Sequence, residues 1–453
     1  MNHEVDFKLI TKARVCLRGE FVGILEKESE EKTIFQYDEE YCARGKAQIS
    51  TSLPVRREPY ISRQLHPFFD NLITEGWLLQ HTEKVFHIDK SNRFALLMAT
   101  GKSPIGAVTI HPLDFLESEI DLTKFFKDDL ELQQLVPFND TPVPNFNRCP
   151  SCFKAVDSGS IHQRCAKKMW GTTKKLSVGL DPTAPQTSFA RVIYGGSISG
   201  AQKKGMFRLN PSKGLLTPVP SGAQYILKPN GVYPELPENE HVTMAIAKKL
   251  GFDVPPFSIL HIDQIGIIFA IKRFDQFENE ALMVEDMGQV ICVPSSDKYQ
   301  SSNEKIAAAI AKYSSAPTID LNKFYRRLIF SYFIGNADMH LKNWSLLENP
   351  KAKGSYMLSP CYDFLNTRLP IPQERIDIGL LLNGKSRNLK WTYFRNFGEK
   401  IKIPKKMVEE PFEKLESWLN TTEEYVSASM LSDSSKEKYL EIVKFRCKIL
   451  KGD

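Results

Sequence analysis

The chain has 453 residues, so we expect more than one domain. Hydrophobic residues make up 42% and charged residues 25%, as in ordinary globular proteins, and the formal net charge of +6 is too small to indicate direct nucleic-acid binding. No apolar run approaches the roughly 18 residues that span a bilayer, and no signal-peptide pattern opens the chain, so we expect no membrane contact. The eight cysteines, mostly scattered, argue against a disulfide framework and favour a reducing cytoplasm.

Residues 1–112 are expected to form a small mixed subdomain rich in β-strands. Ala13–Leu17 and Phe21–Leu25 flank a short turn, which predicts a β-hairpin. A helical apolar pattern extends over Pro67–Gln80. The further strands that we expect are Thr33–Tyr37, Ile49–Leu53 and Gly106–Ile110.

Four further segments follow from changes in composition. Residues 113–146 are acidic and then proline-rich, which predicts a linker, and residues 147–170 carry paired cysteines. Apolar runs alternate with turns in residues 171–293, which predicts a sheet-rich lobe. Residues 294–453 show mostly helical patterns, which are Ile306–Ile310, Phe324–Ile334 and a long amphipathic tail over Pro411–Leu450. A sheet-rich part before a helical part is typical of a two-lobed, protein-kinase-like α+β fold.

The strongest chemical signal lies in the segment Asn336–Asn343. Asp338 stands five residues before Asn343, and Asp363 follows behind an apolar segment. Protein kinases use these residue types in this order: one carboxylate accepts the proton of the attacking hydroxyl, and an amide and a second carboxylate hold Mg²⁺. We therefore predict Asp338 as the general base, Asn343 and Asp363 as metal ligands, and Lys342 as a group that neutralises the transferred phosphate. In isolation, Asp338 and Asn343 could equally be residues that cap a loop.

Other parts of a nucleotide site are expected upstream. Residues 194–204 form a glycine-rich segment, in which backbone N–H groups could approach phosphate oxygens. Lys228 ends a predicted strand, where a kinase lysine would meet the α- and β-phosphates. Glu240 opens a predicted helix that ends at Gly251 and could pair with this lysine, although an acidic first turn is also ordinary. The apolar strand Ile267–Ile271 could lie against an adenine ring or simply be a core strand.

These residues resemble the HipA-type toxin kinases of bacterial toxin–antitoxin systems, from about residue 190 to the end and over residues 1–112. The strings that carry the resemblance are Ser197–Lys203, Asn239-Glu240 before Leu250-Gly251, Arg273-Phe274-Asp275, Glu285-Asp286-Met287, Asn336–Asn343 and Pro360–Asp363. The resemblance implies a kinase-like fold behind a small N-terminal subdomain, with ATP and Mg²⁺ as cofactors. It implies an aminoacyl-tRNA synthetase as protein substrate and a DNA-binding antitoxin of HipB type as partner.

The resemblance also assigns residues. The catalytic Asp falls on Asp338 and the autophosphorylated serine on Ser197. Ser197 and Ser199 together resemble the loop of the HipT branch, in which the N-terminal subdomain is a separate small protein, HipS; here that subdomain is fused. The residues that we expect to bind the nucleotide and its metal are Ser199, Gly200, Ala201, Gln202, Lys203, Lys228, Glu240, Lys272, Phe274, His340, Asn343 and Asp363.

Two other functions are consistent with parts of the pattern. The first is a catalytically silent, kinase-like binding module with antitoxin character, which the intact Lys228, Asp338, Asn343 and Asp363 argue against. The second is a small-molecule phosphotransferase, which shares the Asp-to-Asn spacing but not the serine-containing loop.

A cysteine and histidine cluster precedes the sheet-rich lobe. Cys149 and Cys152 share one two-residue spacing, and His162 and Cys165 share another. Four such ligands suit a closed, tetrahedral Zn²⁺ site of structural type. The alternative is a set of reduced thiols with an incidental histidine.

Overall fold

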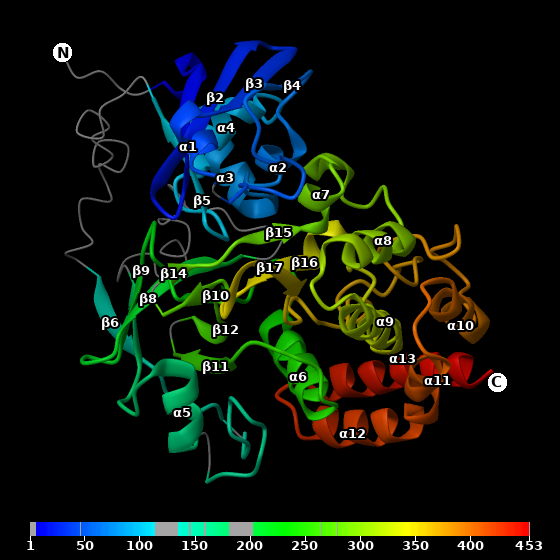
Figure 1. The fold of residues 1–453 in the computed structure, drawn as a ribbon. Helices are drawn as coiled ribbons and strands as arrows, with labels where there is room; N and C mark the ends of the chain where they lie inside the picture. The colour runs from blue at the N-terminus through cyan, green and yellow to red at the C-terminus, as the bar shows by residue number, and fades with distance from the viewer. Residues whose placement is uncertain are drawn as a thin grey trace. The chain divides into compact units, whose positions relative to one another are not determined.

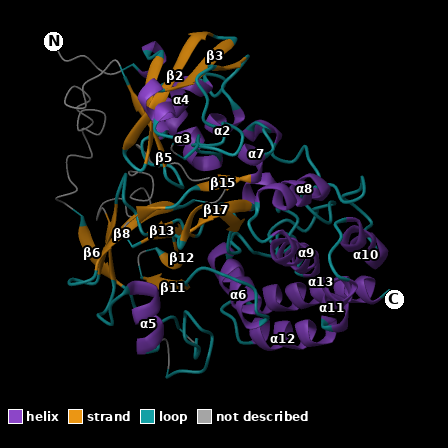
Figure 2. Ribbon diagram, in the orientation of Figure 1, coloured by secondary structure: helices purple, strands orange, loops and turns teal. Residues whose placement is uncertain are grey.

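The computed structural model describes residues 6–45, 47–113, 135–144, 146–157, 160–180, 203–263, 265–278 and 280–452. These residues form a mixed α+β fold, as expected, with its sheets and helices drawn in Figure 1 and Figure 2. None of the helices in this part of the chain has the length and apolar character needed to cross a bilayer.

The chain divides into two compact units, neither of which is continuous in sequence. The first unit comprises Met1–Asn139, Lys175–Ile226 and Asp275–Ser296, and the second comprises Asp140–Lys174, Leu227–Phe274 and Asp297–Asp453. The five segments anticipated from composition remain a prediction, because these units are defined by packing and not by sequence order.

An antiparallel sheet with the strand order β4-β3-β2-β1-β5 opens the first unit. The predicted hairpin is present as β1 and β2, and Val15 on β1 lies opposite Gly23 on β2 and Ile110 on β5. A Cβ at Gly23 would lie 2.2 Å from the carbonyl oxygen of Gln36, so only glycine fits between these strands. The bounds are β1 Lys12–Leu17, β2 Glu20–Ser29, β3 Lys32–Tyr37, β4 Tyr60–Ser62 and β5 Val108–Pro112.

Short helices pack beside this sheet. The helix expected over Pro67–Gln80 is wrong as one element, because the chain turns between residues 71 and 75 and restarts at Gly76, whose φ is +58°. The strand expected at Ile49–Leu53 is also wrong. It is a tight, buried turn in which the N–H of Leu53 donates to the carbonyl of Ser50. The helices are α1 Glu39–Ala43, α2 Pro67–Asp70, α3 Gly76–Phe86, α4 Arg93–Thr100 and α7 Met287–Val290, with the 3-10 helix η1 at Phe7–Leu9.

The remaining strands of the first unit include four neighbours in the order β8-β9-β7-β6, with β7 and β9 parallel and the other pairs antiparallel. β6 falls inside the region expected to be a linker. The bounds are β6 Val136–Asn139, β7 Ser177–Leu180, β8 Gly205–Asn210, β9 Leu215–Pro218, β13 Gln276–Phe277, β14 Glu280–Ala281 and β15 Val284–Asp286.

The second unit begins with the neighbouring strands β11, β12 and β10 and a helix, α6, that packs on β11 and β12. The division between the units falls within β10, so its last residues, including Lys228, belong here. α6 ends before Gly251, whose φ is +81°, as the sequence predicted. The bounds are α5 Gln163–Trp170, β10 Tyr225–Pro229, α6 Leu236–Lys249, β11 Phe257–Ile262 and β12 Gly266–Lys272.

Helices dominate the rest of the second unit, and α13 packs against α9 and α12 in the lower part of Figure 1. The amphipathic tail expected over Pro411–Leu450 is helical, but it is divided among three helices. A β-hairpin, β16 with β17, lies between Asn343 and Asp363 where only an apolar segment was expected. The bounds are α8 Asn303–Tyr313, α9 Pro317–Phe333, β16 Ser345–Asn349, β17 Ala352–Leu358, α10 Trp391–Lys400, α11 Lys405–Glu413, α12 Leu415–Ser427 and α13 Asp433–Lys451, with the 3-10 helix η6 Leu341–Asn343. The 3-10 helix η5, Ser295–Asp297, spans the division between the units in the sequence.

Candidate active site

Lys228 is the centre of a buried charge cluster in the second unit. Its side chain is 4% exposed, and its Nζ donates to Oε1 of Glu240 at 2.6 Å and to Oδ1 of Asp363 at 2.5 Å. Burial by itself would lower the pKa of Lys228, but the carboxylates of Asp363 and Glu240 outweigh it and raise that pKa above its ordinary value. The ammonium group is therefore held charged between two acidic side chains from distant parts of the sequence.

Two asparagines join α6 to the segment that follows Asp363. Nδ2 of Asn239 donates to the carbonyl of Asn366 at 2.8 Å, and the N–H of Asn366 donates back to Oδ1 of Asn239 at 2.9 Å. Both residues are buried, and Asn239 directly precedes Glu240. This reciprocal pair fixes the two carboxylate-bearing segments relative to each other around Lys228.

Backbone and side-chain hydrogen bonds shape the loop that carries Asp338. Oδ1 of Asn336 accepts from the N–H of Asp338 at 3.0 Å, and Nδ2 of Asn343 donates to the Asp338 carbonyl at 2.8 Å. Oγ1 of Thr367 accepts from the N–H of Ala337 at 2.9 Å. The backbone on both sides of Asp338 is thus held by buried polar side chains, whereas Asp338 itself is exposed.

Asp338 accepts a hydrogen bond from the phenol of Tyr299. The Tyr299 ring also meets the His340 ring edge to face, with the centroids 5.0 Å apart. His340, expected to bind the nucleotide, is buried with 2% exposure. Sequence reasoning missed Tyr299, because a single tyrosine 39 residues before Asp338 carries no motif. The contact shows that a hydroxyl group can reach the Asp338 carboxylate and donate a hydrogen bond to it.

Asp363 and Asn343 supply oxygen atoms of the kind that Mg²⁺ prefers. Asp363 has a left-handed backbone with φ of +55°, and its carbonyl accepts from Nδ2 of Asn336 at 3.2 Å. Because Nδ2 of Asn343 is engaged with the loop backbone, the amide oxygen is the end of that side chain suited to a metal. The carboxylate of Asp363 beside Lys228 and the amide oxygen of Asn343 are donor types of a metal–nucleotide site.

The remaining predicted site residues of the second unit have the following surroundings. Lys272 ends β12 and is half-buried, and its N–H donates to the Pro256 carbonyl. Phe274 stacks on Tyr362, the residue before Asp363, with ring centroids 5.5 Å apart. Lys342 is buried, and its carbonyl accepts from the Tyr362 phenol at 3.0 Å. The contacts of Lys272, Phe274, His340 and Lys342 with a nucleotide remain predictions.

The predicted glycine-rich loop is largely beyond what the structure describes. Ser197, Ser199, Gly200, Ala201 and Gln202 lie outside the described residues. Lys203 is described, is half-buried and belongs to the first unit.

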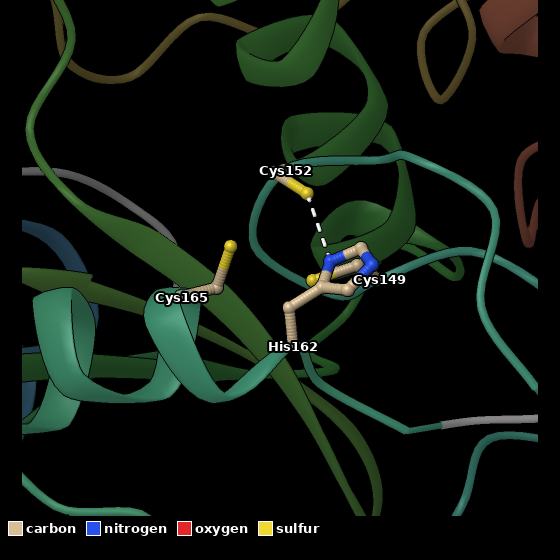
Figure 3. Close-up of side chains that lie close together, drawn as sticks. All are labelled: Cys149, Cys152, His162 and Cys165. Carbon is tan, nitrogen blue, oxygen red and sulfur yellow. Dashed lines mark hydrogen bonds between the residues drawn. The ribbon is translucent and has the colours of Figure 1, made fainter.

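The four predicted zinc ligands come together in the second unit. Cys149, Cys152, His162 and Cys165 place their ligand atoms within 4.8 Å of one another, and Sγ of Cys152 lies 3.3 Å from Nδ1 of His162. Figure 3 shows the four side chains gathered between a turn and the start of α5. All eight cysteines lie in the described part of the chain, and each is free of a disulfide.

Two domain models of one family match this chain. The HipA-like C-terminal domain matches residues 196–422, and the HipA N-terminal domain matches residues 13–111. A Sinorhizobium fredii protein named as a kinase, Y4dM, is 31% identical over 378 residues, which are 79% of this chain and 78% of Y4dM. A second Sinorhizobium fredii protein named as a kinase, Y4mE, is 26% identical over 77% of this chain and 76% of its own length.

A solved structure supports the same fold. HipA of Shewanella oneidensis MR-1, determined in a toxin–antitoxin complex with HipB and operator DNA, superposes with a TM-score of 0.68 and 18% identity over 97% of both chains. At that identity the match is evidence for the fold alone, whereas the domain matches and the identity to Y4dM establish descent. This chain therefore belongs to the HipA-like family.

Proposed function

We propose that this protein is an ATP- and Mg²⁺-dependent serine/threonine protein kinase that acts as the toxin of a toxin–antitoxin system. The observation that carries the proposal is the buried Lys228, held at 2.6 Å by Glu240 and at 2.5 Å by Asp363. A charged lysine, paired with a helix carboxylate and placed beside a second, partly exposed carboxylate, is the arrangement that positions nucleotide phosphates in kinases.

The residues divide the work as follows. Asp338 accepts the proton of the attacking hydroxyl, and its exposure leaves it open to a protein substrate. Asn343 and Asp363 hold the metal, Lys228 contacts the nucleotide phosphates, and Lys342 offsets charge on the transferred group. Bound ATP and Mg²⁺ would supply the phosphoryl group and the charge that stabilises its transfer.

The proposed substrate and partner rest on the family resemblance. The resemblance to HipA-type toxins favours a serine of an aminoacyl-tRNA synthetase as the phosphorylated group. The Shewanella relative was solved with HipB and operator DNA, which supports a DNA-binding antitoxin of HipB type as the partner of this chain. Contact with operator DNA would then be made by the antitoxin.

Autophosphorylation of Ser197 or Ser199 is part of the proposal and is supported by the sequence alone. A phosphate adds about two negative charges in a segment expected to hold the phosphates of ATP. It would compete for the same N–H groups and repel the nucleotide, so we expect activity to fall. Mass spectrometry after incubation with ATP tests this. A double Ser197→Ala and Ser199→Ala variant with unchanged autophosphorylation and ATP affinity would contradict it.

The whole proposal is tested by incubating the purified protein with labelled ATP, Mg²⁺ and cell extract. A labelled band of synthetase size supports it, transfer to a small metabolite favours the phosphotransferase alternative, and absence of transfer favours a silent binding module. Asp338→Asn should reduce transfer about 100-fold or more, the scale of a lost general base. The matched control is Asp433→Asn, because the Asp433 side chain is 99% exposed and should not affect the reaction.

A further inference from the structure

The cysteine and histidine cluster has the geometry of a closed metal site. Zn–S bonds of about 2.3 Å and Zn–N bonds of about 2.0 Å in a tetrahedron place the ligand atoms about 3.5 Å apart. The 3.3 Å between Sγ of Cys152 and Nδ1 of His162, and the 4.8 Å limit over all four ligand atoms, are close to that arrangement. Cys149 is buried, and the other three ligands are half-buried.

The backbone presents these ligands from two built elements. The N–H of Cys149 donates to the carbonyl of Lys154 at 2.7 Å, and the N–H of Phe153 donates to the carbonyl of Cys149 at 2.9 Å. This closes a tight turn in which Phe153 has a φ of +63°. His162 is the N-cap of α5, and Cys165 lies in its first turn. A two-residue spacing within a tight turn brings both of its thiols to one side, as in zinc knuckles.

The same turn is attached to α6, the helix that carries Glu240. The buried Nε2 of His241 donates to the Pro150 carbonyl at 2.7 Å, and Nζ of Lys248 donates to the Ser151 carbonyl at 2.9 Å. Both acceptors lie between Cys149 and Cys152. His241 is the residue next to Glu240, which holds Lys228 at 2.6 Å.

Aromatic rings fix the turn from other sides. The Phe153 ring lies 5.7 Å from the His241 ring and stacks on Tyr425 of α12 at 4.6 Å, with 10° between the planes. Phe146 meets the His241 ring edge to face at 6.0 Å. The turn is therefore packed between α6 and α12. A change in the conformation of the turn would alter its contacts with α6.

The charge balance also favours a metal. Zn²⁺ with three thiolates and a neutral imidazole carries a net charge of −1, and the three thiols release their protons to solvent as the metal binds. Lys248, whose Nζ donates to the Ser151 carbonyl between Cys149 and Cys152, would offset this charge. The cation that ties α6 to the turn is thus also the counter-ion of the site.

We infer that Cys149, Cys152, His162 and Cys165 bind one Zn²⁺ in a closed structural site, and that this site holds α6 in the position from which Glu240 pairs with Lys228. Loss of the metal releases the Pro150–Ser151 turn, loosens α6 and weakens nucleotide binding. The last step rests on the proposed kinase function, whereas the metal site and its hold on α6 do not.

Metal content of the purified full chain tests the site. We expect about one zinc per chain by mass spectrometry, and a tetrahedral thiolate spectrum after replacement by Co²⁺. His162→Ala and Cys152→Ser should lose the metal. Cys42→Ser, which changes a half-buried cysteine elsewhere, should retain it. Wild-type protein without zinc and without the cobalt spectrum would overturn the site.

Lys248→Met tests the tie to α6 with every ligand intact. The variant should keep its zinc but lose it to a chelator about tenfold faster than wild type. A tenfold effect is about the lower end of the range for removal of a partner outside the metal ligands. An unchanged rate of zinc loss would show that Lys248 does not support the site. This variant also keeps the inference testable if the ligand variants fail to fold.

Hydrogen exchange separates the coupling from the kinase chemistry. Amides of Leu236–Lys249 should exchange faster in metal-free than in zinc-loaded protein, with Trp391–Lys400 as the internal reference. Unchanged exchange in α6 after metal loss would overturn the coupling. ATP affinity with Mg²⁺ should fall about tenfold on metal loss, within the usual range of coupling between sites. Zinc-loaded protein that binds no ATP would instead contradict the proposed function, while metal content and α6 exchange still decide this inference.

Discussion

At the scale of single residues, the pairing of Lys228 with Glu240 has consequences for stability as well as for ATP. Glu240 is 0% exposed, so removal of its partner leaves a buried carboxylate without its counter-charge. Lys228→Met should destabilise the protein by about 3–5 kcal/mol, the range for breaking a buried ion pair from one side, and should abolish ATP binding.

Urea unfolding of Lys228→Met and of the double variant with Glu240→Gln measures this effect. The second change removes the stranded charge, so it should restore part of the lost stability without restoring ATP binding. Lys405→Met, at an exposed lysine, serves as the control. If the double variant were less stable than Lys228→Met alone, the charge left on Glu240 would not be the cause of the lost stability.

Tyr299 makes a different prediction, because its phenol occupies an acceptor site on Asp338. A substrate hydroxyl must take over that hydrogen bond, and a hydrogen bond is worth about 1 kcal/mol net. Tyr299→Phe should therefore raise kcat/KM for a peptide substrate by about fivefold, with ATP affinity unchanged. Initial rates over a range of peptide concentrations provide the measurement. A decrease would show that Tyr299 orients Asp338 for catalysis.

At the scale of elements, α6 is joined to the segment after Asp363 through Asn239. Asn239→Ala leaves the buried N–H and carbonyl of Asn366 without the partners they have here. We expect about 1–3 kcal/mol less stability and a lower kcat, because Asp363 is held less firmly. Thermal unfolding and steady-state kinetics check this prediction. Asn349→Ala, at the end of β16, is the control. Equal kcat values for the two variants would indicate that the pair is only structural.

The sequence predicted elements well where a local signal was complete. The β1–β2 hairpin, the strand with Lys228, and the end of α6 at Gly251 all follow from turn residues and apolar runs that need no distant partner. The helix expected over Pro67–Gln80 failed because apolar spacing continued across a turn that ends at Gly76. In the C-terminal tail, Ser432 caps α13 by accepting from the N–H of Ser435, a capping signal that could have marked the break.

The residue types of the candidate site came from a motif. Order and spacing led to Asp338, Asn343 and Asp363, whose roles in catalysis and metal binding stay predictions. The contacts around them were not predictable, because Tyr299, Thr367 and Asn366 are ordinary residues that act only through tertiary position. The β16–β17 hairpin was missed because the first half of β17, residues 352–355, shows no alternation of apolar and polar residues. Asn349-Pro350 was the one turn signal between the strands.

At the scale of the whole molecule, Glu285 connects distant parts of the first unit and makes its stability depend on pH. Its carboxylate accepts from Oγ of Ser50 at 2.5 Å and from the N–H of Thr51 at 2.8 Å. Burial outweighs these hydrogen bonds and raises the pKa of Glu285 to about 7. The folded state therefore favours the protonated acid.

Because the pKa of Glu285 is higher in the folded than in the unfolded state, its protonation stabilises the fold. This stabilisation is fully present below the unfolded pKa of about 4.5 and is lost as the pH rises through about 7. The size of this change is about 3 kcal/mol. Glu285→Gln should flatten the dependence of the unfolding midpoint on pH between 5 and 7.5, whereas Glu58→Gln, at an exposed position, should not. Identical pH profiles for wild type and Glu285→Gln would refute the assignment.

The contacts of Glu285 with Ser50 and Thr51 also bear on how this architecture could be divided between two polypeptides. Asp70 makes a parallel link, because it accepts from the N–H of Ser295 at 2.7 Å. A gene split after residue 112 would leave both acceptor–donor sets on opposite products. The two products would then keep complementary hydrogen-bonding groups, and co-expression should recover them as a heterodimer.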